Sequence, residues 1–357
     1  TSALLYDVTS RFNVELSFDI AHDRSKPYFG TPLVPSAFAT QGVNGVVVTN
    51  DGRTVDARML RQNYNVTDSD MSALTTWTKL KANWQPTDWM EFRNQTYYYT
   101  AKRDWMSAET YTLDAGTQQL GRDRFLVQHD QSVIGDRLEV QLNHPIAGFK
   151  NRFVSGIDFT YTDFKRPSFF NGAVDTVDPF SPNQGLFGGG STALQTATIL
   201  DTAFFAEDQF SVTDRLKLVA GTRTDAIHLD REGFTATGAS NALQTFSQNF
   251  TATTWRAGVV YDVLPEATVY GQYATAVDPV SSSLFVARAN QKFELATGMQ
   301  WEVGAKGQFW NKRAEWTVAY FDIVRKNILT QISQIDALNV GRQSSKGVEL
   351  DVAAKLT

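Results

Sequence analysis

The stretch that decides the fold is residues 296–330, which read ATGMQWEVGAKGQFWNKRAEWTVAYFDIVRKNILT. From Met299 to Ala305 every second residue is apolar, and the residues between them are polar or glycine. Successive side chains of a β-strand point to opposite faces, so this spacing predicts a strand with one apolar and one polar face. In a helix the same residues would place charge on the apolar stripe.

The same alternation recurs along the chain, with acidic and basic residues on the polar face of strand after strand. The clearest further runs are residues 12–20, 216–225, 255–261 and 347–356. In a soluble sandwich such a polar face meets bulk water, whereas in an outer-membrane barrel it meets a wet lumen and the apolar face meets lipid. The alternation alone is compatible with both.

Short turns and long polar loops alternate along the sequence. The short turns are predicted at 85–88, 143–149, 212–215, 262–266 and 309–313, and the long loops at 23–54, 104–121, 165–198, 230–245, 278–291 and 327–339. Short turns at one end of the strands and long loops at the other are typical of outer-membrane barrels. A soluble sandwich instead shows a turn signal about every 8–12 residues.

Aromatic residues flank the short turns. Trp84 and Trp89 lie on either side of one turn, and Trp310 and Trp316 lie on either side of another. Rings at these places form the interfacial girdle of a membrane barrel. The alternative is that they fill an ordinary apolar core.

The composition excludes several classes of protein. The 357 residues include no Cys, so neither a disulfide nor a thiolate metal site is possible. The net charge of −5 gives no reason to expect nucleic acid, and no apolar run approaches the roughly 18 residues of a membrane-spanning helix. The 4 His residues show no metal-ligand spacing, and no nucleophile or phosphate-loop motif is present. We expect no metal site, no catalytic site and no enzyme.

Four segments carry a resemblance to a known family. They are AEDQFSVTDRLKLVAGTRTD at 206–225, WRAGVVYDVLPEATVYGQYATAVDP at 255–279, the stretch 296–330 quoted above, and NVGRQSSKGVELDVAAKLT at 339–357. In this order they resemble the strand–turn–strand signatures of TonB-dependent outer-membrane receptors, specifically the ferric-siderophore branch. The preceding residues match more loosely, mainly through QPTDWMEFRNQTYYY at 85–99.

The resemblance implies an all-β fold, a transmembrane antiparallel up-and-down β-barrel. Such a barrel has about 22 strands, of which about 12 complete ones and the end of another at residues 4–8 are expected here. We therefore expect residues 1–357 to be an internal part of the barrel domain. The N-terminal plug domain, about three strands before the chain and about six after it are expected to belong to a longer receptor.

The function implied is energised uptake of a ferric siderophore across the bacterial outer membrane, coupled to the TonB complex. The expected partners are the siderophore, TonB, the protein's own plug and outer-membrane lipid, in a monomer. No protein cofactor is expected, since the iron arrives inside the siderophore. The alternatives are import of haem, cobalamin or an oligosaccharide, a passive diffusion porin, and a soluble β adhesin.

In the family, aromatic and Arg residues on the outer side of the cell capture the iron chelate. Because Met90 and Phe92 are apolar, the odd-numbered residues of this run belong to its polar face. The predicted ligand-binding residues are Tyr97, Tyr99, Arg103, Trp105, Phe169, Phe170, Tyr270 and Gln272. The loop residues Phe169, Phe170, Phe180 and Phe187 are candidates for a closing lid. The alternatives are rings at the membrane interface, and loop phenylalanines that pack the loop against itself.

Charged residues on the polar faces are predicted to contact the plug. They are Arg223, Asp225, Arg256, Glu302, Lys306 and Glu349. Such charges are costly against lipid but tolerable in a polar lumen. The alternative is that they hydrogen-bond to one another across adjacent strands. Glycines on the same faces, among them Gly304 and Gly347, leave room for a strand to bend or for another segment to approach.

Overall fold

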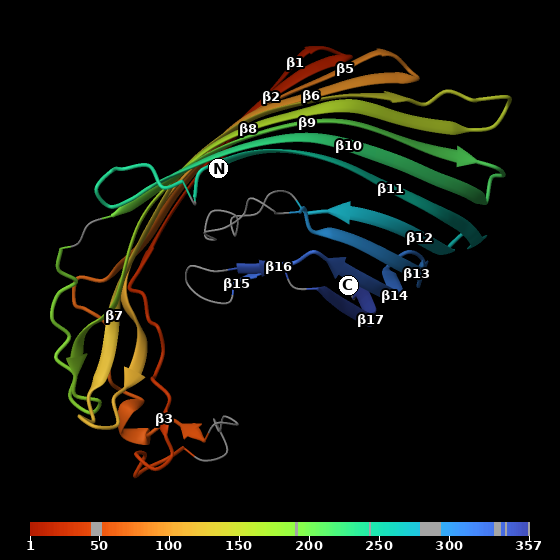
Figure 1. Cartoon of the computed structure of the whole chain (residues 1–357). Helices are drawn as coiled ribbons and strands as arrows, with labels where there is room; N and C mark the ends of the chain where they lie inside the picture. The colour runs from red at the N-terminus through yellow and green to blue at the C-terminus, as the bar shows by residue number, and fades with distance from the viewer. Residues whose placement is uncertain are drawn as a thin grey trace.

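The computed structural model is a single large sheet bowed into an arc (Figure 1). It describes residues 1–43, 52–189, 192–242, 244–278, 294–331, 337–339 and 341–355, and of residues 169–174, 329–331 and 337–339 the backbone only. Within these residues the sheet has 13 antiparallel strands that pair in chain order. They are β1 (Ser2–Thr9), β2 (Phe12–Ser25), β5 (Asp70–Thr87), β6 (Met90–Leu113), β7 (Leu120–Leu142), β8 (Asn151–Val177), β9 (Ala193–Ser211), β10 (Leu216–Phe234), β11 (Phe246–Leu264), β12 (Ala267–Val277), β13 (Thr297–Phe309), β14 (Ala314–Lys326) and β17 (Arg342–Ala354).

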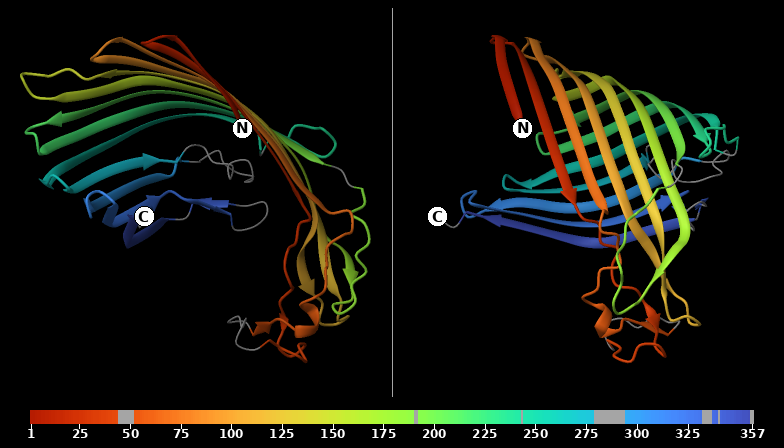
Figure 2. Two further views of the ribbon diagram at one scale, coloured as in Figure 1. Left: turned by 180° about the vertical axis from the view of Figure 1, so that it is seen from behind. Right: turned by 90° about the vertical axis from the view of Figure 1, so that its left-hand side faces the viewer.

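The strands are tilted and coil around the arc (Figure 2), as strands of an up-and-down barrel wall do. The predicted all-β, antiparallel fold class and the short turns are confirmed. Each short turn joins two strands that neighbour each other in the sheet, as between β13 and β14. No helix within the described ranges has the length and hydropathy needed to cross a membrane.

Two of the predicted long loops are wrong in extent. Much of 104–121 and of 165–198 is strand, because β6 continues to Leu113 and β8 to Val177. The backbone ladder persists there, with Ser107 opposite Phe125. The alternation of side chains fades because both faces of these strand ends are covered by polar or loop-packed groups, so the pattern no longer reports the strand.

The remaining loops differ from the prediction in smaller ways. The segment between β2 and β5 contains the short pair β3 (Val34–Pro35) and β4 (Arg53–Thr54) and one turn of 3₁₀ helix, η1 (Ala57–Met59). The short strands β15 (Leu329–Gln331) and β16 (Ala337–Asn339) pair within the predicted loop 327–339. Most of the predicted loop 278–291 lies outside the described residues.

The two faces of the sheet are chemically opposite. Trp301, Val303 and Phe204 on the outer face are 57%, 55% and 54% exposed, large fractions for apolar side chains. The inner face carries ion pairs, such as Lys81 Nζ to Glu15 Oε1 at 3.2 Å. A face of the sheet that exposes large apolar side chains in this way is what a lipid-facing surface requires.

Aromatic side chains line the rim at the short turns. The rings of Trp84 and Phe92 stack with their centroids 5.4 Å apart, and Phe149 contacts Phe210 at 5.3 Å. Trp84 is 50% exposed. The alternative that the turn-flanking aromatics fill a core is therefore wrong, and they are placed as an interfacial girdle.

Inner-face glycines receive an aromatic ring from the neighbouring strand. A Cβ on Gly304 would lie 2.6 Å from the ring of Tyr270, and a Cβ on Gly347 would lie 2.8 Å from the ring of Phe321. Each ring therefore lies flat across the glycine opposite it in the ladder, which fills the space and fixes the register. The segment that approaches these glycines is the adjacent strand itself.

At the end of the sheet opposite the short turns, loops fold into a compact unit that we call the loop cap (Figure 1, around β3). It consists of residues 26–43 and 52–69, the adjoining ends of β6, β7 and β8, and residues 178–189. Its apolar core is made by Val34, Met59, Tyr64, Leu120 and Val177. Segments far apart in the chain thus share one core at this end.

Candidate functional site

Tyr97 and Tyr99 lie on the inner face of β6, with a third aromatic residue beside them. The Trp77 ring on β5 meets the rings of Tyr97 and Tyr99 edge-on, at 6.3 Å and 5.7 Å between centroids. The Tyr97 ring lies across Gly135, whose added Cβ would come within 2.3 Å of it. Tyr97 is thus held by packing, and the three rings form one aromatic surface. Sequence reasoning missed Trp77, although its parity on β5 could have identified it.

Arg103 and Trp105 continue the same face of β6 toward the loop cap. The Arg103 guanidinium lies 5.0 Å from the centre of the Trp105 ring, a cation–π distance. Trp105 Nε1 donates to Ser107 Oγ at 2.9 Å and to Glu109 Oε1 at 2.6 Å. These bonds fix the indole where the sheet meets the cap. The structure therefore brings four predicted ligand-binding residues onto one strand face, which we call the upper wall: Tyr97, Tyr99, Arg103 and Trp105.

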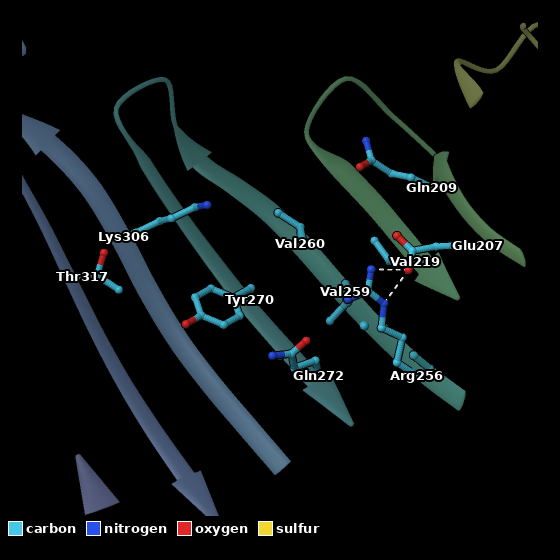
Figure 3. A pocket seen from close by; sticks show the side chains of 13 residues that line it. Glu207, Gln209, Val219, Arg256, Val259, Val260, Tyr270, Gln272, Lys306 and Thr317 are labelled. Carbon is cyan, nitrogen blue, oxygen red and sulfur yellow. Dashed lines mark hydrogen bonds and ion pairs between the residues drawn. The ribbon is translucent and has the colours of Figure 1, made fainter. Parts of the chain in front are cut away.

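Tyr270 and Gln272 belong to a different place. They lie on β12 close to its short turn, beside a cavity of about 490 Å³ on the inner face (Figure 3). Tyr270 Oη donates to Glu302 Oε1 at 2.9 Å, and its ring covers Gly304. The structure does not bring these two residues together with the upper wall. These contacts give Tyr270 a structural role, because they hold it against the neighbouring strand β13.

The predicted plug-facing charges form a belt on the inner face at this lower level. Arg223 makes ion pairs with Asp158 at 3.0 Å and with Asp225 at 2.7 Å. Arg256 is paired with Glu207 across the intervening strand, as Figure 3 shows. Such neighbours satisfy each other's charge within the wall. Arg223 and Arg256 are thus paired across strands, as in the alternative to plug contact, whereas Asp225 is paired with Arg223 on its own strand.

The other three charged residues of the belt make no ion pair with a described residue. Glu302 accepts from Tyr270 and from Gln300 Nε2, the latter at 2.6 Å, but makes no ion pair with a described residue. Lys306 borders the cavity, and Glu349 lies on the inner face of β17. Within the described part of the chain, neither Lys306 nor Glu349 is ion-paired. These three are the charges still able to bind a further segment.

Two of the four loop phenylalanines, Phe180 and Phe187, pack inside the loop cap. Phe180 stacks on Phe38 with centroids 5.7 Å apart, and the Arg58 guanidinium lies 3.8 Å from the centre of its ring. Phe187 is buried against Val66 and Ala108. For these two residues the alternative of packing within the loops describes what is observed. The side chains of Phe169 and Phe170 lie outside the described residues.

The buried guanidinium of Arg122 connects several segments of the loop cap. Arg122 is 1% exposed, and its guanidinium donates to both carboxylate oxygens of Asp175 at 2.8 Å. The same guanidinium donates to the backbone carbonyls of Tyr64 at 2.7 Å and Gln184 at 2.8 Å. It therefore links β7 to the end of β8 and to the two loop segments 52–69 and 178–189. Sequence reasoning missed it, because none of these partners is near Arg122 in the chain.

Two ionisable side chains of the loop cap have pKa values that are shifted by their surroundings. Hydrogen bonds from the Arg58 side chain, which outweigh burial, hold the pKa of Asp56 well below its ordinary value. Burial raises the pKa of Tyr64 well above its ordinary value, and its hydroxyl donates to the Pro179 carbonyl at 2.5 Å. Both groups are thus locked in one protonation state at neutral pH. The cap is a preformed part of the structure.

Among the described residues, no three His, Asp or Glu side chains gather in the way that a metal site requires. The inner face instead offers rings, guanidinium groups and carboxylates. These groups bind by stacking and hydrogen bonding.

The chain matches known proteins over most of its length. Residues 6–357 match the family model described as TonB dependent receptor-like, beta-barrel. The catecholate siderophore receptor Fiu of Escherichia coli O157:H7 is 21% identical over 378 residues, which cover 94% of this chain and 48% of Fiu. The ferrioxamine B receptor of Salmonella typhimurium strain SL1344 is 26% identical, over 69% of this chain and 33% of the receptor.

The fold is also that of solved receptors. The crystal structure of the ferric-catecholate import receptor Fiu from E. coli K12, in its closed form, superposes with a TM-score of 0.81 at 17% identity, over 99% of this chain and 55% of Fiu. The chain thus spans about half the length of Fiu, and about a third of the ferrioxamine B receptor.

Proposed function

Because this chain belongs to the TonB-dependent receptor β-barrel family, we propose that its protein imports a ferric siderophore across the bacterial outer membrane. The chain supplies barrel wall and loop cap, and its exposed apolar band meets the outer-membrane lipid. Members of this family are receptors and transporters, so the protein is not an enzyme. The iron is cargo carried inside the siderophore.

One observation carries the choice of substrate class. The upper wall collects three aromatic rings and an exposed guanidinium on the inner face, just below the cap. Flat rings stack on the planar arms of an organic chelate, and a guanidinium pairs with its anionic oxygens. The wall contains no group that would form or break a bond of the ligand.

The rest of the mechanism needs segments outside this chain. A plug domain in the lumen would meet the lower belt through Glu302, Lys306 and Glu349, while the paired charges of the belt keep the wall rigid. TonB would then act on the plug, and binding outside would favour the state that TonB can open. We expect a monomer, because the lumen of a single barrel holds the whole path.

Growth of a deletion strain on a panel of iron chelates tests this function. We expect the strain to lose growth on one chelate or one chemical class, and to regain it with the full-length gene on a plasmid. A strain lacking the TonB protein serves as the control for energised uptake. Equal growth of the deletion and parent strains on every chelate of the panel would contradict the proposal.

A further inference from the structure

Three basic side chains form a row on the inner face near the loop cap. Arg103 on β6 is opposite His129 on β7 in the strand ladder. In the next ladder Asp130 is opposite Lys165, which places His129 opposite Arg166 on β8. Side chains that lie opposite each other in a ladder share a face of the sheet. We call Arg103, His129 and Arg166 the cationic row.

The row has polar and aromatic neighbours but no acidic ones. Arg103 lies over the Trp105 ring, and Arg166 Nη1 donates to the side-chain oxygen of Gln195 at 3.2 Å. Burial, together with the charges of the two guanidinium groups, lowers the pKa of His129 to about 4. This imidazole is therefore neutral at pH 7, and the positive charge of the row belongs to Arg103 and Arg166. Within the described residues, no carboxylate lies at ion-pair distance from Arg103 or Arg166. Positive charge therefore accumulates here without an internal counter-charge.

Some other basic residues of the sheet do have an acidic partner. Lys102 and Lys165 precede the two arginines and point to the opposite face, where Lys102 Nζ lies 3.9 Å from Asp130 Oδ2. In the lower belt, Arg223 lies between two aspartates. Because no carboxylate among the described residues lies at ion-pair distance from the two arginines, a positive potential remains at this place on the inner face.

We propose that the cationic row binds anionic oxygens of the incoming iron chelate and makes the receptor select anionic chelates over neutral or cationic ones. This inference rests on the proposed function. A tris-catecholate iron(III) chelate is strongly anionic, because three doubly deprotonated catechols outweigh one ferric ion. A tris-hydroxamate chelate is neutral, or cationic where its backbone carries an ammonium group. Only the first carries a net negative charge that two guanidinium groups can pair with as well as hydrogen-bond.

The test is a titration of the purified full-length receptor with two ferric chelates, a tris-catecholate and an ammonium-bearing tris-hydroxamate. We expect Arg103→Gln and Arg166→Gln each to weaken catecholate binding about tenfold, the loss of a charge-assisted hydrogen bond. The double variant should lose about a hundredfold, and hydroxamate binding should not weaken. Lys102→Gln and Lys165→Gln are matched controls, since they remove the same charge from the other face.

A second pair of variants guards against misfolding. Arg103→Lys and Arg166→Lys keep the charge, so they should retain most of the preference for the anionic chelate. Equal losses for both chelates, or equal losses in the lysine controls, would overturn the inference. A wild-type receptor that prefers the cationic chelate would also overturn it but would leave the receptor function standing. Binding of neither chelate, together with no loss of growth in the deletion strain, would instead count against the proposed function.

Discussion

Replacing Val303 by lysine is expected to destabilise the folded receptor in a bilayer by about 2–3 kcal/mol, the cost of placing a cation on the lipid face of a membrane barrel. Val303 is 55% exposed on the outer face of β13. It shares a row with Val259, which lies on β11 between the aromatic residues Trp255 and Tyr261 of the two girdles. A lysine there has no partner and no water in the apolar band. The measurement is the free energy of unfolding of the full-length receptor in phospholipid vesicles.

Gln272→Lys is the matched control for this experiment. Gln272 lies at nearly the same height on the neighbouring strand, but on the inner face, opposite Glu302. A lysine there can pair with that carboxylate, so we expect the free energy of unfolding to change by less than about 1 kcal/mol. If the two lysines cost the same, the assignment of the two faces is wrong.

Truncation of Arg122 to alanine should open the loop cap. The change removes every hydrogen bond that the guanidinium donates, and it leaves the carbonyls of Tyr64 and Gln184 buried without their donor. Breaking a buried, hydrogen-bonded cation site of this sort costs about 2–4 kcal/mol. The cost is local, because the cap has its own core, so we expect faster hydrogen exchange and proteolysis in residues 60–69 and 178–189.

Arg61→Ala is the control within the same cap. Arg61 is exposed, and truncation of an exposed side chain changes stability by about 0.5 kcal/mol or less. The strands below the cap should keep their protection in both variants. Slow exchange in the cap of the Arg122→Ala protein, equal to that of the wild type, would show that the cap does not depend on this cation.

Much of the wall could be predicted from local pattern. The alternation from Met299 to Ala305 depends only on neighbours in the chain, so it identified both the strand and its faces. The turns were predictable for the same reason, since each short connection lies between two such runs. The pattern failed where strands extend into the cap, because packing on both faces removes the alternation on which the prediction depends.

The candidate site was predictable in part. The parity of β6 placed Tyr97, Tyr99 and Arg103 on one face, and the register bears out that placement. His129 and Arg166 could not be grouped with Arg103, because that needs the exact pairing register of three long strands, which local pattern does not give. The role of Arg122 could not be predicted from the sequence, for a related reason. Its partners become neighbours only when two loops have folded onto the ends of β7 and β8, and no local pattern records such contacts.

The sequence pattern also could not decide between plug contact and mutual pairing for the lower belt. Charge type and parity are the same in both cases. Cross-strand distances separate them, and they show Arg223 and Arg256 paired while Lys306 remains available. A wall of this kind is rigid where its charges are paired, and it is receptive where they are not.

The central claim is that alternate side chains of these strands face lipid and a hydrated lumen. The chain contains no Cys, so single cysteines introduced at positions 299–303, 305 and 306 can carry a nitroxide label, whereas Gly304 is left unchanged because the Tyr270 ring covers it. With the receptor in vesicles, electron paramagnetic resonance then measures the label's collisions with oxygen, which partitions into lipid, and with a water-soluble nickel chelate. We expect oxygen contact to peak at 299, 301, 303 and 305 and nickel contact at 300, 302 and 306. Equal access of the nickel chelate to both sets of positions would contradict the account.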